Sequence, residues 1–153
     1  MPQPTHTAAD VTAQLLIDLG LASDVEQGTS WPVFVNGRPD QPDSLVSVTD
    51  TQGLDGGRLM VSKQRLEYHG LQLLLRSAKQ HDAHAKTRQV CNALDEVLQA
   101  TVRIAGGNGI PAGRYLVHSI QRTGTPLSMG REPTSARRTM FSINCLVTLT
   151  QLE

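Results

Sequence analysis

The chain has 153 residues, with 14 basic and 14 acidic side chains and a formal net charge of zero. Its 39% hydrophobic content suffices for one folded domain, which we expect to span residues 1–153. The 3% aromatic content argues against a base-stacking surface for single-stranded nucleic acid, and the neutral charge argues against an obligate DNA-binding domain. No apolar run approaches the ~20 residues of a membrane-spanning helix. Cys91 and Cys145 form neither a disulfide framework nor a zinc signature.

The charge is unevenly distributed along the chain. Residues 1–60 carry eight acidic and two basic side chains, whereas residues 61–153 carry six acidic and twelve basic ones. Eleven of the fourteen basic residues are arginines, which pair bidentately with carboxylates and are enriched at interfaces. Opposite poles suit head-to-tail contacts between identical copies, which close into a ring when the rotation permits. The alternative is that the two halves interleave in one fold and that their charges cancel locally.

The N-terminal region predicts a short amphipathic helix. Residues 1–6 are polar and proline-rich, and we expect them to form a loose N-terminal segment. Thr7 and Asp10 have the spacing of a capping box at a helix start. The apolar side chains behind them recur at helical spacing until Gly20, which can adopt the left-handed conformation that ends a helix.

Two short strands are predicted next. Residues 32–35 and 45–49 are rich in valine, and Asn36-Gly37 directly after the first segment is a hairpin-turn signal. We therefore expect these segments to pair as an antiparallel hairpin. Residues 50–64 are polar and contain three glycines, which predicts a loop that returns the chain.

The rest of the chain predicts a central strand, a long helix and three further strands. Residues 68–77 contain the densest apolar run and are interpreted as a central strand, with a helix as the rival interpretation because leucine favours helices. Residues 82–99 carry apolar side chains at three- and four-residue spacing and predict the clearest helix. Strands are expected at 101–104, 114–122 and 139–150, and the last alternates between an apolar and a mostly polar face.

This order of elements predicts an α+β fold. We expect an antiparallel or mixed β-sheet of about four to six strands with two α-helices packed on it. The long helix is expected to contact the sheet through Val90, Leu94 and Val97.

Candidate catalytic and metal-binding residues are few. His81, Asp82 and His84 lie together at the start of the long helix, but a zinc site requires three or four converging ligands. The glycine-rich run at 105–109 lacks the Lys-Ser/Thr of a phosphate-binding loop and fits a hairpin loop better. We therefore predict no catalytic residue, no metal and no cofactor.

The connection between the last two predicted strands, residues 123–138, is unusually long. Most hairpin loops have about two to five residues, and long loops are usually functional or disordered. This one carries three arginines, and we interpret it as a contact surface for another chain or for a nucleic-acid backbone. Its ends are expected to contribute little to the core. The candidate partner-contact residues are Arg58, Arg131, Arg137, Arg138, Asp50 and Asp55.

Several segments together resemble a known family. Across Ser47–Arg58 a predicted strand passes into Asp-Thr-x-Gly and then Arg, and the short strand at Trp31–Val35 precedes it. The further segments are Gly70–Ser77, Tyr115–Val117, Ser119–Thr123, Gly130, Arg137–Arg138 and Phe141–Asn144. In order and spacing, over most of residues 10–150, they resemble phage minor capsid proteins of the tail-terminator type.

The resemblance implies a small α+β virion protein that is not an enzyme. It implies a homo-hexameric ring at the head-proximal end of a long phage tail, made in the bacterial host cytoplasm. Such a ring ends tail-tube polymerisation and joins the tail to the head connector, so its partners would be itself, the tail-tube protein and the head-completion protein. DNA would pass through without specific binding, and no membrane would be involved.

Three other interpretations of the function stay open. One is a small metal-dependent hydrolase that uses His81, Asp82 and His84, and another is a ligand-binding module on a similar sheet. The third is a neighbouring head-completion or tail-tube protein.

Overall fold

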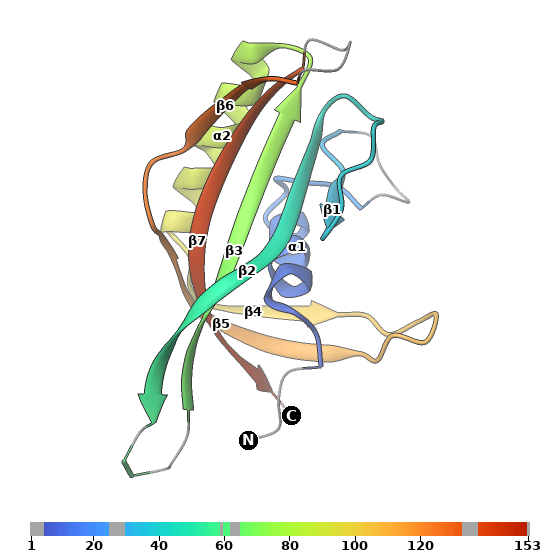
Figure 1. Ribbon diagram of the computed structural model, residues 1–153. Helices are drawn as coiled ribbons and strands as arrows, with labels where there is room; N and C mark the ends of the chain where they lie inside the picture. Colours follow the sequence, from blue (N-terminus) through green and yellow to red (C-terminus); the bar gives the residue numbers. More distant parts are fainter. Residues whose placement is uncertain (1–4, 25–29, 59, 62–64, 133–137, 153) are drawn as a thin grey trace.

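The computed structural model describes residues 5–24, 30–58, 60–61, 65–132 and 138–152. It contains two helices and, in the described part of the chain, seven strands (Figure 1). The α+β prediction is confirmed, with more strands than the four to six expected. The elements are α1 (Ala8–Asp18), β1 (Val33–Val35), β2 (Leu45–Arg58), β3 (Arg65–Ser77), α2 (Gln80–Asp95), β4 (Leu98–Ile104), β5 (Gly113–Arg122), β6 (Leu127–Arg131) and β7 (Thr139–Leu152).

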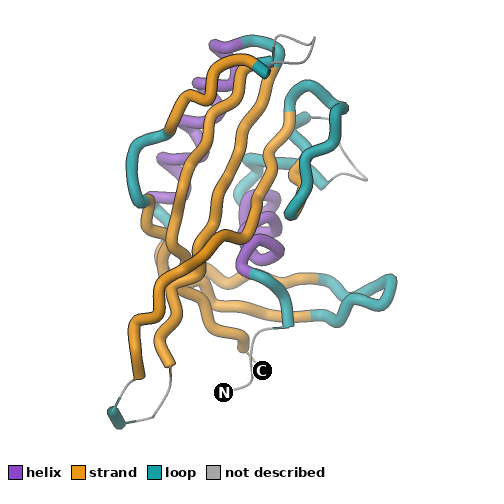
Figure 2. The backbone as a smooth tube through the Cα atoms, in the orientation of Figure 1, coloured by secondary structure: helices purple, strands orange, loops and turns teal. Residues whose placement is uncertain are grey.

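The strands form one curled mixed sheet in the order β1-β2-β3-β7-β5-β4 (Figure 2). β1 and β2 are parallel, and all other described pairs are antiparallel. β7 is long enough to have two neighbours on one side: β6 pairs with its first residues, and β5 pairs with its second half. β3, which carries the predicted central strand, lies in the middle of the sheet.

Both helices cover the same face of the sheet and share one hydrophobic core. The Thr7 side chain accepts a hydrogen bond from the Asp10 N–H and the Asp10 carboxylate accepts one from the Thr7 N–H, so the predicted capping box is confirmed. α1 packs mainly on β1, β2 and β4, and α2 packs on β3, β5 and β7. The predicted helix stripe is buried at Ala83, Thr87, Val90, Cys91 and Leu94, and the predicted strand face is buried at Phe141, Ile143, Cys145 and Val147.

The opposite face of the sheet has two parts. At one end, segment 36–44 crosses it, and the Ser47 hydroxyl donates to the Gly37 carbonyl at 2.7 Å. Side chains beneath this segment, such as Leu45 and Leu74, are buried. No segment of the described residues covers the middle of the face, and the register places on it the uncharged side chains of Thr49, Gln72, Ser119, Gln121, Asn144, Leu146 and Thr148.

The predicted hairpin between residues 32–35 and 45–49 is wrong. β1 and β2 are adjacent but parallel, with Val33 opposite Val46. Asn36 does have the positive φ of a turn residue, but its side chain exchanges hydrogen bonds with Asp50. A parallel pair needs a connection that carries the chain back, and segment 36–44 serves that purpose.

Other predicted boundaries also differ from the structure. Residues 50–58, expected in a loop, continue β2. The long helix ends at Asp95 rather than near residue 99, and Gln99 has a positive φ at the start of β4. Segment 123–138, expected to be an irregular loop, contains the strand β6.

Part of the N-terminal segment is held firmly instead of being loose. His6 is buried, and its ring nitrogens lie 2.7 Å from the Tyr115 hydroxyl and 2.9 Å from the Pro111 carbonyl oxygen. Thr5 exchanges hydrogen bonds with the Gln151 side chain. Residues 1–4 lie outside the described residues. Among those described, neither helix is long and apolar enough to cross a membrane.

Candidate assembly site

β2 and β3 continue beyond the body of the sheet as a hairpin arm, residues 52–58 and 65–69 (Figures 1 and 2). Pairing with β1 ends before the arm on one side, and pairing with β7 ends at its root on the other. Leu54 is 60% exposed, and Met60 and Val61 near the tip are almost fully exposed. Because a two-stranded hairpin is marginally stable alone in water, the arm has the character of a segment that another chain completes.

Two glycines allow the arm to leave the body. The β2–β3 register shifts between Thr51 and Leu54, and a Cβ on Gly53 would collide there with the Tyr68 carbonyl oxygen. On the opposite strand, a Cβ on Gly70 would lie 2.5 Å from Thr51 Oγ1. The two backbones therefore approach too closely for side chains, and the bulge increases the local twist that turns the arm away.

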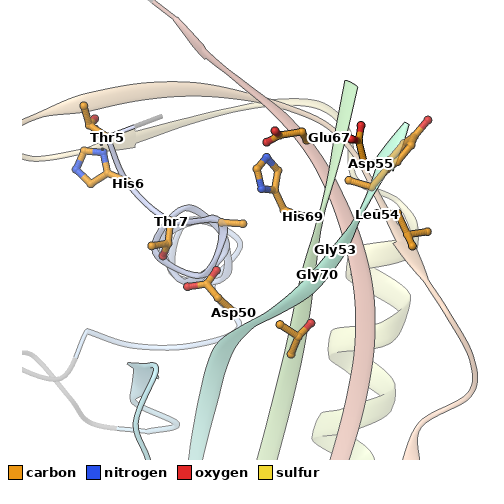
Figure 3. Close-up of a pocket in the computed structure, with 13 residues that line it drawn as sticks. Thr5, His6, Thr7, Asp50, Gly53, Leu54, Asp55, Glu67, His69 and Gly70 are labelled. Carbon is orange, nitrogen blue, oxygen red and sulfur yellow. Dashed lines mark hydrogen bonds between the residues drawn. The ribbon is translucent and has the colours of Figure 1, made fainter. Parts of the chain in front are cut away.

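An open groove of about 540 Å³ lies at the root of the arm (Figure 3). The N-terminal segment with the start of α1 forms one wall, and the adjoining parts of β2 and β3 form the other. Among the described residues its lining carries carboxylates but no lysine or arginine, so this surface is complementary to basic side chains. The ionisable lining side chains are His6, Asp50, Asp55, Glu67, Tyr68 and His69.

The two acidic candidates from the sequence both line this groove but differ in their contacts. Asp50 accepts a hydrogen bond from the Ala9 N–H at 2.9 Å, in the first turn of α1, where the helix dipole favours a carboxylate. Asp55 lies exposed on the arm and accepts a hydrogen bond from the Gly57 N–H at 2.9 Å. Asp50 therefore holds α1 on the sheet, whereas Asp55 is a surface group. That either one contacts a partner stays a prediction.

Arg76 and Arg138 are buried together at the end of the sheet opposite the arm. Arg76 donates hydrogen bonds to four main-chain carbonyl oxygens of segment 39–43, at 2.7–3.2 Å, and pairs with Glu132 at 3.3 Å. Arg138 donates to the main-chain and side-chain oxygens of Asp40 and forms an ion pair with Glu132 at 2.5 Å. The two arginines thus fix segment 39–43 over the ends of β3 and β7.

This network corrects one expectation and exposes a residue that sequence reasoning missed. The side chain of Arg138, expected at a loop end outside the core, is 2% exposed and has internal partners; a contact with a partner stays a prediction. Arg76 lies within the predicted central strand at residues 68–77, and no local pattern predicts its burial. Burial, and then the charge of Arg138, lower the pKa of Arg76, whereas Glu132 acts in the opposite direction.

The other candidate arginines have different surroundings. Arg58 is exposed at the end of β2, on the arm. Arg131 is exposed at the end of β6, and Arg137 lies outside the described residues. The structure therefore brings Arg58 and Asp55 together on one exposed element and separates both from Arg131.

The residues considered for metal chemistry do not converge. His81, Asp82 and His84 are exposed in the first turns of α2, and the His84 ring contacts Phe141 edge-on. Among the described residues there is no group of three or more His, Cys, Asp or Glu side chains that could hold a metal ion. The glycine-rich run at 105–109 lies in the connection between β4 and β5, as the sequence predicts.

The fold and its arm define a small α+β protein with a projecting, unpartnered hairpin. The model of the bacteriophage tail terminator protein family matches residues 14–150. The chain therefore belongs to the bacteriophage tail terminator family, and it is a structural protein of the phage tail. Membership in this family places it in the virion. No curated protein matches the chain.

Proposed function

We propose that six copies of the chain form a ring at the head-proximal end of the tail. The ring ends polymerisation of the tail tube and provides the surface that joins the head connector. In this role the protein acts by binding and not by catalysis. Besides the family match, the proposal rests on the exposed apolar side chains of the hairpin arm.

The arm supports a role in assembly because its apolar side chains have no core to enter. Leu54, Met60 and Val61 are exposed on an element whose strands, in the described residues and beyond His69 toward the tip, pair only with each other. A monomer that functioned in isolation would gain nothing from such an element, whereas a neighbouring subunit can bury it. Arm-to-body contacts are heterologous, so they close into a ring when the rotation permits.

The uncovered face of the sheet supports the passage of DNA. Its middle carries hydroxyl and amide side chains together with Leu146, and none of these is charged. Arg103 and Arg114, on the same face, lie away from the middle, toward the β4 edge. Affinity for the DNA backbone comes mainly from lysine and arginine. If this face lines the ring, DNA slides past it without being held.

The proposal is tested by tail assembly in a phage whose copy of this gene carries Met60→Asp and Val61→Asp. Because both side chains are exposed, the purified variant should keep the circular dichroism spectrum of the unchanged protein. Lysates should contain tails of uncontrolled length without heads, as seen by electron microscopy. The matched control is Ile110→Asp, since Ile110 is 55% exposed on the β4–β5 connection, away from the arm.

Tails of normal length on filled heads in the arm variant would contradict the proposal. A tail-tube protein should instead give lysates with no tails when its assembly surface is changed. A head-completion protein should give tails of normal length that lack heads. The length distribution therefore separates the terminator from its two neighbours.

A further inference from the structure

β6 offers an open strand edge next to the body of the sheet. Its five residues pair with the first residues of β7, and in the described part of the chain β6 has no strand on its other side. All five residues are exposed, including the apolar Leu127 at 61% and Met129 at 45%. The edge thus combines unpaired main-chain groups with exposed apolar side chains.

Such an edge is usually protected in a protein that stays monomeric. Natural sheets block edges with proline, lysine, bulges or covering loops because an open edge pairs with any extended chain. β6 has a bulge between Ser128 and Gly130, but no proline or lysine within its bounds. An extended segment added at this edge would satisfy its main-chain groups and bury Leu127 and Met129.

The same chain carries a matching unpaired strand. In the described residues, the outer edge of β2 has no strand partner from Asp50 to Arg58, a length greater than that of β6. Leu54 on this stretch is exposed, as are Leu127 and Met129 on β6. We propose that the outer edge of β2 in the hairpin arm of one copy pairs with the β6 edge of the next copy. This inference rests on the proposed ring.

The two edges carry some opposite charges, although Arg58 at the end of β2 is basic like Arg131. Arg131 ends β6, and Arg88 lines the small groove between α2 and β6. On the arm, Asp55 lies on β2 and Glu67 lies on β3, beside the acid-lined groove. Opposite charges facing one another across a strand pair stabilise it and help to fix the partner's orientation.

Disulfide crosslinking in assembled tails tests this pairing. One variant carries Leu54→Cys with Leu127→Cys, and a second carries Leu54→Cys with Met129→Cys. Two variants are needed because the proposal does not fix which β6 residue lies opposite Leu54. The native Cys91 and Cys145 are buried, and burial raises the pKa of Cys145 to about 12, so they should not react. Oxidation should give a ladder of covalent oligomers up to the complete ring with at least one pair, and no ladder with any single cysteine.

The comparison variant carries Leu54→Cys with Leu98→Cys. Leu98 is 73% exposed at the start of β4, the other open edge on that side of the sheet. A ladder from this pair, or a complete ring without any ladder from the β6 pairs, would overturn the inference while leaving the ring intact. A crosslink from Leu127→Cys to the tail-tube protein would do the same. Tails that lack a ring of this chain would overturn the proposed function as well.

A charge substitution provides an independent readout. Leu127→Lys with Met129→Lys should leave the monomer folded, because both side chains are exposed, and should abolish incorporation into tails. Ile110→Lys is the matched control and should be incorporated normally. Normal incorporation of the β6 variant would overturn the inference.

Discussion

Arg76 connects segments that are far apart in the sequence. Its guanidinium group satisfies four carbonyl oxygens of segment 39–43, which lies 33 to 37 residues earlier in the chain, and it also pairs with Glu132. Arginine suits this position because its planar fork of five donors can bond several acceptors at once. A lysine offers a single point charge and three donors, so it cannot replace that geometry.

Removing Arg76 should therefore destabilise the fold strongly. Arg76→Met should lower the free energy of unfolding by about 3–5 kcal/mol, because it leaves part of the buried Glu132 charge and four partly buried carbonyl groups without a partner. Urea denaturation followed by circular dichroism measures this change. Arg103→Met, at an exposed position on β4, is the matched control and should stay within about 0.5 kcal/mol. An effect of Arg76→Met as small as the control's would show that the network contributes little.

Asp95 and Arg122 form a surface ion pair between α2 and β5. Arg122 donates two hydrogen bonds to the carboxylate, at 2.8 and 2.7 Å, and these lower the pKa of Asp95. The folded state thus binds this proton more weakly than the unfolded state. The stabilisation is complete above the ordinary pKa of an aspartate and is lost as the pH falls through the lower folded value.

Asp95→Asn should therefore have a pH-dependent effect. At neutral pH it should lower the free energy of unfolding by less than about 1 kcal/mol, because both side chains are partly exposed and screened by solvent. The difference from the unchanged protein should shrink from about pH 4 downward. A difference that grows as the pH falls would contradict the assignment.

α2 is the element in which local pattern and tertiary packing agree best. Leu94 is fully buried in the stripe that faces β3, β5 and β7. Leu94→Ala should lower the free energy of unfolding by about 2–5 kcal/mol, since it removes buried surface and leaves a cavity. Gln89→Ala, on the exposed side of the same helix, should stay within about 0.5 kcal/mol. Equal effects of the two changes in thermal or urea unfolding would show that the stripe does not face the core.

The hairpin arm depends on the close approach of two backbones. Gly53→Ala should destabilise the protein by about 1–3 kcal/mol, because the added methyl group meets main-chain atoms that cannot yield easily. Gly124→Ala is the control, since nothing lies within 4 Å of the position where its Cβ would be placed. Urea titration of both variants measures the difference. No change in the free energy of unfolding with Gly53→Ala would mean that the bulge relaxes to accommodate the methyl group.

The sequence predicts the helices and the core strands better than the arm. The capping box at Thr7 involves residues three positions apart, and the alternation in β7 follows from burial of one face on the core. Both can therefore be predicted from short stretches of sequence. The arm buries no face, and its glycine-rich strand from Gln52 to Arg58 has no apolar alternation that would separate it from a loop. The internal role of Arg138 depends on Asp40, 98 residues away, which no local pattern encodes.

Some charged side chains of the molecule form ion pairs within one copy, and others stay exposed on its surface. Asp40 and Asp43 from the acidic first part of the chain pair with Arg138 from the basic remainder, so the poles partly cancel inside one fold. The arm and the groove at its root keep exposed carboxylates, and β6 ends in an exposed arginine. We propose that these exposed groups act between neighbouring subunits.

The proposed ring is tested most directly by a reconstruction of the head-proximal end of intact tails by cryo-electron microscopy. We expect a single ring of six copies capping the tube, with each hairpin arm on its neighbour and the uncharged middle of the open sheet face toward the DNA. Copies of this chain along the whole tube, a two-fold dimer in place of a ring, or a neck without this fold would contradict the proposal.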